Sequence, residues 1–428
     1  MMHWTDVRPA VIIRRRNSAT VGGEKNNMQF IQTKNQISWQ TISSLFLGSF
    51  VTFACLYCTQ PLIPLFSEQF QVSPAAASLS VSLATGFMAA FMLIAAWISD
   101  AKGRKVIMGI SLLSTAVLQI FIGFSTNFTW LLVLRAIQGM MVAGFPAIAM
   151  AYIAEEFDPA TSGLVMGIYI SGNSIGGLTG RMVVGAVTDF FSWQNALLTI
   201  GIISLAAAMW FWLKLPASRN FSPRPRAVPA IIGVMWNTVR KPQLLLLYLI
   251  GFLVMGSFVT VYNYIGYPLM APPYSLSHTV VGLIFVIYLV GTFSSTWLGS
   301  LAITAGRPRV LLLAICIMAA GCLITLGASL LLKIAGIAVF TFGFFGCYSV
   351  VSSWVGQCAG NDKASASSLY LFFHYTGASV IGAWGGNFLD EYGWNGIVAL
   401  TVIALLLALA LLAALLLYTR RRECLITP

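Results

Sequence analysis

The chain has 428 residues, of which 58% are hydrophobic and 8% are charged, and its formal net charge is +12. Soluble globular domains carry about 25% charged residues, so this composition, with a mean hydropathy of +0.85, excludes a soluble protein. We therefore predict an integral membrane protein.

Apolar runs long enough to cross a hydrocarbon core of about 30 Å recur along the chain. Residues 1–36 precede them, and we expect a disordered tail there, with either Met1 or Met28 as the true start. The twelve predicted spans are residues 41–63, 79–98, 106–125, 130–152, 164–188, 194–213, 244–266, 279–301, 310–331, 334–354, 367–388 and 397–418. The predicted fold class is an all-α integral membrane protein with twelve transmembrane helices.

Basic residues concentrate on one side of this topology. Of the 24 lysines and arginines, 21 fall in the two tails and in the loops that follow even-numbered spans. The positive-inside rule assigns that side to the cytoplasm, so both termini are predicted to be cytoplasmic. Topology accounts for the net charge, which therefore gives no argument for binding nucleic acid.

The basic, proline-containing segment 214–243 predicts a cytoplasmic linker between two bundles, residues 37–213 and 244–418, and residues 419–428 form a cytoplasmic tail. The seven cysteines lie in or beside apolar runs, which argues against a disulfide framework. The sequence shows no metal cluster, phosphate loop or cofactor motif, so we expect no cofactor.

The stretch AAWISDAKGRK at residues 95–105 predicts a hairpin between two membrane helices. Each of its charges would cost roughly 2.5 to 3.5 kcal/mol inside the bilayer, so the turn lies in water. Asp100, Gly103, Arg104 and Lys105 resemble the loop pattern G-x-L-x-D-x-x-G-R-K of the major facilitator superfamily of transporters, although an alanine replaces its first glycine. The alternative is an ordinary hairpin whose basic residues only set the topology.

Three motifs of the first half recur in order in the second half. GSFVT occurs at 48–52 and again at 256–260, and the pattern G-x-x-x-D-x-x-x-W at 185–193 recurs at 386–394. The hairpin recurs as GSLAITAGRPR, where Gly299, Gly306 and Arg307 take motif positions and Ile303 replaces the aspartate. The chain is therefore a duplicated six-helix unit.

The superfamily uses two six-helix bundles with a substrate site between them near the membrane midplane. The resemblance runs from the first span to the twelfth and implies a secondary transporter that works by alternating access in a bacterial inner membrane, and we expect a monomer. It also implies a conformational latch, in which Glu155, Glu156 and Asp158 at the end of the fourth helix pair with Arg104 and Lys105, while Asp100 faces the eleventh helix. The latch residues are Asp100, Gly103, Arg104, Lys105, Gly299, Gly306 and Arg307.

The fourth span carries Arg135, Gln138 and Gly139 on one helical face. This R-x-x-Q-G resembles the second motif of the family, whose arginine is tied to proton transfer or substrate binding. We therefore assign Arg135 and Gln138 to a substrate or proton pathway. The alternative is that Arg135 snorkels to the outer interface.

The fifth span carries small residues that predict close helix packing, namely Gly172, Gly176, Gly177 and Gly180. Its GNSIGG segment resembles the G-P-x-x-G-G of the family's antiporters, but Asn173 stands where the proline would be, which weakens an inference of export. Asn173 and Arg181 lie about 80° apart around the helix and are assigned to the border of a cavity.

Polar residues in three other spans complete the predicted pathway. They are Tyr57 and Gln60 in the first span, Asn263 and Tyr267 in the seventh, and His374 in the eleventh. An amide in an apolar run needs a partner or a ligand. His374 is able to change charge near neutral pH, although a lone histidine is more often a hydrogen-bonded structural residue.

No Asp or Glu falls in the middle of a predicted span, and the charges predicted inside helices, Arg135 and Arg181, are positive. We therefore predict proton-linked efflux of a small neutral or anionic molecule, such as a sugar, metabolite or drug. The alternative is an uptake symporter or facilitator for a sugar or organic acid. An intramembrane serine protease is a remote alternative, because Ser174 lies in a G-x-S-x-G pattern and His374 is a candidate partner. We expect a transporter rather than an enzyme.

Overall fold

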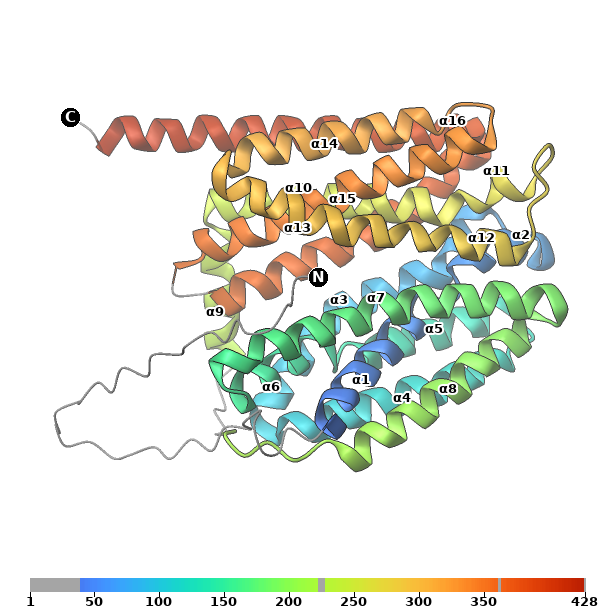
Figure 1. Ribbon diagram of the computed structural model, residues 1–428, viewed down its shortest axis with the longest axis horizontal. Coiled ribbons are helices and arrows are strands. Elements are labelled where there is room, and N and C mark those ends of the chain that lie inside the picture. The colour runs from blue at the N-terminus through green and yellow to red at the C-terminus, as the bar shows by residue number, and fades with distance from the viewer. Residues whose placement is uncertain (1–38, 222–227, 361–362, 427–428) are drawn as a thin grey trace, which may run out of the picture.

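The computed structural model describes residues 39–221, 228–360 and 363–426, and these residues form a long bundle of helices (Figure 1). No strand occurs among them. The predicted tail at 1–36, with Met1 and Met28, lies outside the described residues.

The first half of the chain forms six rods, two of which are built from shorter helices. In order they are α1 (Trp39–Tyr57) with η1 (Gln60–Leu62) and α2 (Ile63–Phe70), α3 (Pro74–Lys102), α4 (Arg104–Gly123), α5 (Phe128–Val142) with α6 (Pro146–Glu156), α7 (Pro159–Phe190) and α8 (Trp193–Lys214). The breaks in the first and fourth rods fall at Pro61 and Pro146, because proline has no N–H to continue the helical hydrogen bonds.

The second half repeats this order. It contains α10 (Pro242–Tyr264) with α11 (Gly266–Met270), α12 (His278–Leu283) with η2 (Ile284–Ile287) and α13 (Tyr288–Thr304), α14 (Arg307–Ile324), α15 (Leu330–Cys358) and α16 (Lys363–Ile426). Gly393 interrupts α16 with φ +59° and ψ −149°, a conformation that glycine adopts easily, so α16 supplies two rods.

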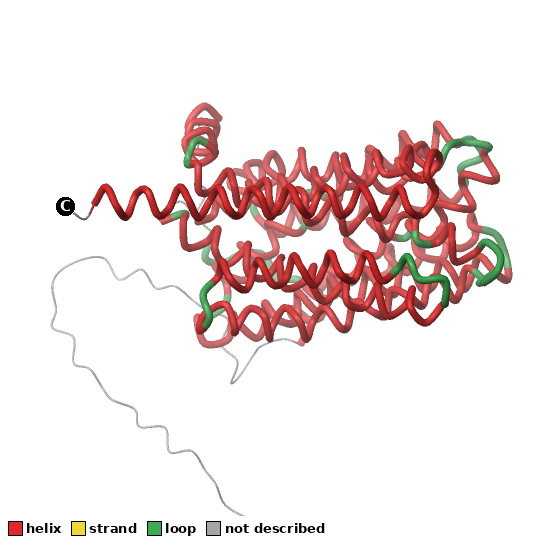
Figure 2. The backbone as a smooth tube through the Cα atoms, turned by 90° about the horizontal axis from the view of Figure 1, so that it is seen from above, coloured by secondary structure: helices red, strands yellow, loops and turns green. Residues whose placement is uncertain are grey.

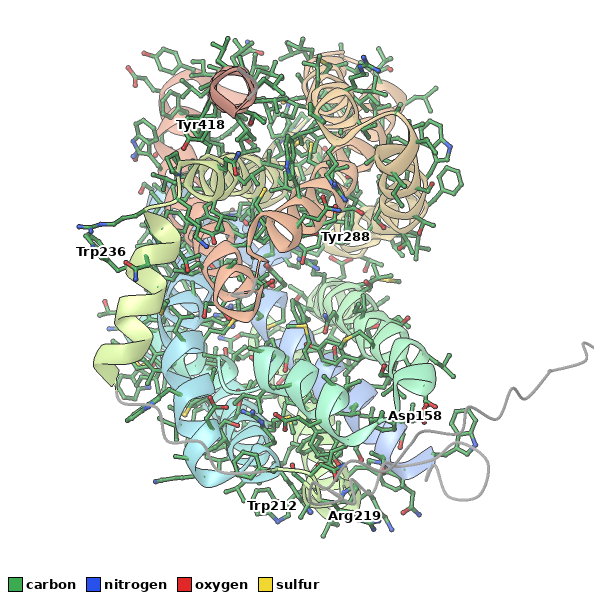
Figure 3. The ribbon with its side chains drawn as sticks, turned by 90° about the vertical axis from the view of Figure 1, so that its left-hand side faces the viewer. Asp158, Trp212, Arg219, Trp236, Tyr288 and Tyr418 are labelled. Atoms are coloured by element: carbon green, nitrogen blue, oxygen red, sulfur yellow. The ribbon has the colours of Figure 1, made fainter. Side chains whose placement is uncertain are left out.

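The predicted count of twelve spans agrees with these rods. Ten helical stretches within the described ranges are long and apolar enough to cross a membrane, and one of them, Ser365–Thr419, covers most of α16. The count reaches twelve when α16 is divided at Gly393 and the 32-residue α7 is included. The structure also places a helix, α9 (Val228–Val239), in the predicted linker, and Figures 2 and 3 show it beside the bundle rather than in it.

Buried apolar side chains form two separate cores. One draws its buried residues from Ile42 to Leu215, and the other from Leu244 to Leu415. In Figure 1 the first is the lower, blue to green part and the second is the upper, yellow to red part. We call residues 39–215 the N-half and residues 242–426 the C-half.

The rods give the molecule two ends. The turn between α3 and α4 and the turn between α13 and α14 lie at the left in Figure 1, and we call this the basic end. The opposite end, where α2, α11 and α12 lie, is called the distal end.

At the distal end the two halves touch. A Cβ atom at Gly185 of α7 would lie 2.5 Å from the carbonyl oxygen of His278, so α7 and α12 come as close as glycine permits. The carboxylate of Asp189 accepts hydrogen bonds from the backbone N–H groups of His278 at 3.0 Å and Thr279 at 2.8 Å. Partial burial raises the pKa of Asp189, but hydrogen bonding from the side chain and backbone of Thr279, from the side chain of Ser277 and from the backbone of His278 outweighs it and holds the pKa below its usual value of 3.8. We call Gly185, Asp189, His278 and Thr279 the distal clasp.

Candidate functional site

A cavity of about 300 Å³ lies between the two halves. Its aromatic walls are Phe53, Tyr57, Tyr169, Phe258, Tyr288, Phe344, Phe345, Tyr348 and Tyr375, and its other apolar walls are Met92, Pro146, Met150, Ile170, Met255, Val259 and Leu371. The remaining lining residues are Gln60, Asn173, Ser174, Gly177, Arg181 and His374. Figure 3 looks at the basic end and shows Tyr288 on the C-half where that half faces the N-half.

Gln60 lies where the first rod breaks, and it links the two halves. Its amide Nε2 donates to Oδ1 of Asn263 at 2.8 Å, while its Oε1 accepts from Nε of Arg181 at 2.8 Å. Because Asn263 belongs to α10, this hydrogen-bond chain runs from α7 through η1 into the C-half. Three of the predicted pathway residues are therefore joined by hydrogen bonds, and two of them, Gln60 and Arg181, line the cavity.

The Arg181 guanidinium is buried, with 2% of its surface exposed. Its Nη1 donates to the backbone oxygen of Gly177 at 2.6 Å, one turn earlier in α7. Its central carbon lies 4.5 Å from the ring centroids of both Tyr57 and Phe285, and 5.2 Å from that of Tyr288. The charge is thus held by aromatic faces from both halves, which attract a cation through their quadrupoles.

Asn263 and Tyr267, predicted together from their spacing, have different surroundings. Asn263 is 1% exposed, and its Nδ2 has no hydrogen-bond partner among the described residues. Tyr267 does not line the cavity; its hydroxyl donates to the backbone oxygen of Ile63 at 3.4 Å. Tyr267 instead borders a second hollow, of about 610 Å³, that opens at the distal end beside Glu68.

His374 lines the cavity from the C-half. It is 4% exposed and lies among aromatic rings, 5.0 Å from Tyr348 and 5.4 Å from Tyr370 between centroids. Its Nδ1 has no hydrogen-bond partner in the described structure, so the imidazole is not held as a fully satisfied structural residue.

Asn173 also lines the cavity, and its side-chain oxygen accepts a hydrogen bond from the Ser49 hydroxyl of α1. The neighbouring Ser174 donates to the backbone oxygen of Ile170 at 3.5 Å and sits inside the regular helix α7. A G-x-S-x-G nucleophile requires a sharp strand-to-helix turn, which α7 does not provide. The protease hypothesis therefore gains no support from the geometry.

The glycines of the fifth rod bring α7 against α1. Cβ atoms at Gly172, Gly176 and Gly180 would lie 2.6, 2.4 and 2.8 Å from backbone oxygens of α1. Gly177 lies on the adjacent face, where a Cβ atom would be 3.2 Å from Nη1 of Arg181. The stripe permits backbone contact between helices, while Gly177 leaves room for the guanidinium.

Arg135 and Gln138 lie in the interior of the N-half and do not line the cavity. The Arg135 guanidinium donates to Gln138 and to the backbone oxygens of Cys55, Leu56 and Ser80. The carbonyls of Cys55 and Leu56 end α1, where helical partners are missing and a cation is favoured. Arg135 therefore caps a broken helix; it does not snorkel, and the geometry does not bring it to the predicted pathway.

The two basic-end hairpins share their backbone but not their charges. Gly103 and Gly306 both have positive φ, +99° and +89°, which suits glycine at these turns. In the N-half, Arg104 pairs with Asp100 at 2.5 Å and with Glu155 at 2.7 Å.

In the C-half, Arg307 instead donates to the neutral side chains of Gln357 and Ser353. Gly299 is the other residue of the second copy, and a Cβ atom built on it would lie 2.7 Å from Oγ of Ser349. Lys105 follows Arg104 in the first turn of α4. Asp100 thus bonds within its own half rather than to the eleventh rod.

Sequence reasoning missed most of the aromatic wall, including Tyr288, Tyr348 and the ring of Phe285. Aromatic residues are equally common on lipid-facing and cavity-facing sides of membrane helices, so no periodicity distinguishes these three. The distal clasp did leave a signal, since Gly185 and Asp189 belong to a motif that recurs in the second half.

Several proteins resemble this chain over nearly its whole length. It is 46% identical over 382 residues to the uncharacterized MFS-type transporter YybF of Bacillus subtilis (strain 168), covering 89% of this chain and 95% of YybF. It is 43% identical over 395 residues to the inner membrane transport protein YnfM of Escherichia coli (strain K12), covering 92% and 94%. A shorter match, 30% over 193 residues, covers 44% of this chain and 47% of the multidrug resistance protein MdtG of Proteus mirabilis (strain HI4320).

Solved structures share the fold. A bacterial homologue of the human lysosomal transporter Spinster, in an inward-facing and unoccupied conformation, has a TM-score of 0.72 at 17% identity and covers 89% of this chain and 98% of its own. The human organic anion transporter MFSD10 has a TM-score of 0.64 at 15% identity, covering 88% and 100%. A sequence model described as Major Facilitator Superfamily matches residues 45–267. With the two long relatives, this match shows that the chain belongs to the major facilitator superfamily of membrane transporters.

Proposed function

We propose that the protein is an alternating-access carrier of a bacterial inner membrane, which exports a small neutral or anionic molecule in exchange for protons. The observation that carries this proposal is the cavity between the halves, whose charged lining residue is Arg181 and whose lining includes no Asp or Glu. The proposal places the basic end and both termini in the cytoplasm. It also describes a monomer, because one chain supplies both walls of the cavity.

The charge of the cavity limits the substrate. A cationic substrate would meet the buried Arg181 guanidinium without a carboxylate to compensate for it, and like charges in a low dielectric repel strongly. Neutral or anionic molecules avoid this cost. The sequence alone left two intramembrane arginines as candidates for the charge that meets the substrate. The geometry favours Arg181, because Arg135 donates to backbone oxygens away from the cavity.

Export is supported by the partial match to MdtG, a multidrug resistance protein, and by the GNSIGG segment of α7. Asn173 replaces the antiporter proline in that segment, so uptake by symport or facilitation is the second candidate. The proposal assigns proton exchange to His374, a cavity residue whose Nδ1 has no hydrogen-bond partner among the described residues.

The test uses inside-out membrane vesicles that contain the protein and are acidified by respiration, with a pH-sensitive dye inside. Addition of an exported sugar, organic acid or drug should release protons, and the response should be lost in Arg181→Gln. Arg309→Gln, which removes an exposed cation of α14, serves as the matched control and should respond like the wild type. Silence for every compound, combined with uptake of a radiolabelled compound into whole cells, would replace export by the second candidate.

A further inference from the structure

The Arg181 guanidinium lacks a counter-charge. The two ion pairs among the described residues both involve Arg104 at the basic end, and none involves Arg181. A buried charge is costly unless it is paired, and hydrogen bonds to neutral oxygens with aromatic faces offset only part of that cost. The cavity therefore contains a cation that a negatively charged ligand would neutralise.

The hydrogen bonds leave specific donors free at this cation. Arg181 donates through Nε to Gln60 and through Nη1 to Gly177, while its Nη2 makes no hydrogen bond with a described residue. Arg181 lines the cavity, so this nitrogen is available to a ligand there. A carboxylate matches a free guanidinium N–H, because it accepts hydrogen bonds and also supplies the missing negative charge.

The rest of the cavity indicates the body of the ligand. A cavity of 150 Å³ is known to hold one benzene molecule, so about 300 Å³ accommodates roughly two rings. Aromatic residues such as Tyr57, Tyr288 and Phe344 provide flat walls on both halves, which favour a flat apolar body.

We propose that this cavity binds a small organic monocarboxylate with an aromatic or alicyclic body of about two rings, its carboxylate accepting from Arg181. The inference rests on the proposed transport function and narrows its substrate class from neutral or anionic molecules to organic anions. The body of such a ligand lies between walls from both halves, so its binding also favours the conformation in which the halves are closed around it.

The test compares an acid with its amide, which has nearly the same shape but no charge. Binding of 2-naphthoate and 2-naphthamide, with benzoate and benzamide as a smaller pair, is measured by calorimetry on the full-length protein in lipid nanodiscs. We expect the wild type to bind each acid about ten- to hundredfold more tightly than its amide, the contribution of hydrogen bonds to a charged group. In Arg181→Gln the ratio of acid affinity to amide affinity should fall to about one, and Arg181→Lys should retain part of the preference for the acid.

The ratio of the acid affinity to the amide affinity distinguishes loss of the charge contact from misfolding, because a damaged cavity would weaken the binding of both ligands together. Arg309→Gln serves as the control, since it removes an exposed cation outside the cavity, and its ratio should match the wild type. Equal binding of acid and amide, no binding of either acid, or an unchanged ratio in Arg181→Gln would each overturn the proposal.

The failure of this inference is distinguishable from failure of the proposed function. Proton release by a neutral compound in the vesicles, without acid preference in binding, would keep the exporter and discard the anion site. Acid preference that depends on Arg181, without proton release in the vesicles, would keep the site and discard proton-linked export.

Discussion

Removal of the Asp189 carboxylate should open the distal end. In the structure this carboxylate accepts two backbone N–H groups at the start of α12, which is how an N-cap residue acts, but here it comes from the other half of the protein. Loss of such a cap costs about 0.5–2 kcal/mol. Because Asp189 is largely exposed, we expect about 1 kcal/mol for Asp189→Ala, which changes the ratio of distal-closed to distal-open molecules about fivefold.

The assay is a distance measurement between spin labels on distal loops of the two halves. Thr126→Cys, after α4, and Ala328→Cys, after α14, are exposed positions outside the clasp, and the label pair is placed in a background without the native cysteines. Asp189→Ala should increase the population at longer distance. Glu391→Ala removes another exposed acid of the distal region and should leave the distribution unchanged. An unchanged distribution in Asp189→Ala, or the same shift in both variants, would refute the clasp.

Three further outcomes follow from the packing and the charges. Gly176→Val should lower the melting temperature by the equivalent of about 1–3 kcal/mol, because a Cβ at this position would lie 2.4 Å from a backbone oxygen. Gly167→Val is the control and should not lower it, because open space surrounds Gly167. Equal effects of the two variants would contradict the close contact between α7 and α1. Asp100→Asn removes one of the two acidic partners of Arg104, and we expect the transport rate to change about two- to fivefold. An unchanged rate and accessibility would contradict the latch. The pKa of Asp189 is lowered in the closed clasp. The ionised carboxylate therefore stabilises the closed distal end fully above pH 3.8, and this stabilisation is lost only as the pH falls through the lowered pKa. The label distances should therefore stay constant between about pH 5 and 8, and a transition in that range would assign closure to another group.

Hydropathy and internal repetition were sufficient to predict the fold. Spans of about 20 apolar residues have few stable arrangements in a bilayer, so twelve of them with repeated motifs limit the architecture strongly. Helix breaks were harder to predict, because Pro61 interrupts its rod while Pro74 and Pro242 begin theirs. The difference depends on position within the helix, which hydropathy does not report. The helix α9 also escaped prediction, since it lies in a basic segment with several prolines.

The site was predicted in part. Gln60, Asn263 and Arg181 were chosen because polar groups in apolar helices need partners, and the structure brings these three together. The same argument chose Arg135, whose partners are mostly backbone oxygens. Because every residue carries a backbone oxygen, no sequence pattern reveals which ones a broken helix leaves free. Tyr267 was included by spacing alone, and helix packing turned it toward the distal hollow.

The residues that contact the two buried arginines are translated at different stages of synthesis. The Arg135 guanidinium of α5 donates hydrogen bonds to backbone oxygens of residues 55, 56 and 80, all of which precede it in the chain. When the ribosome delivers α5 to the membrane, these acceptors are already present, and they offset part of the insertion cost of about 2.5–3.5 kcal/mol for a lone arginine. Arg181 has Gln60 available at that stage, but Asn263, Phe285 and Tyr288 are still untranslated. The N-half can therefore mature as it is made, whereas the wall of the cavity around Arg181 is completed only when the second half arrives.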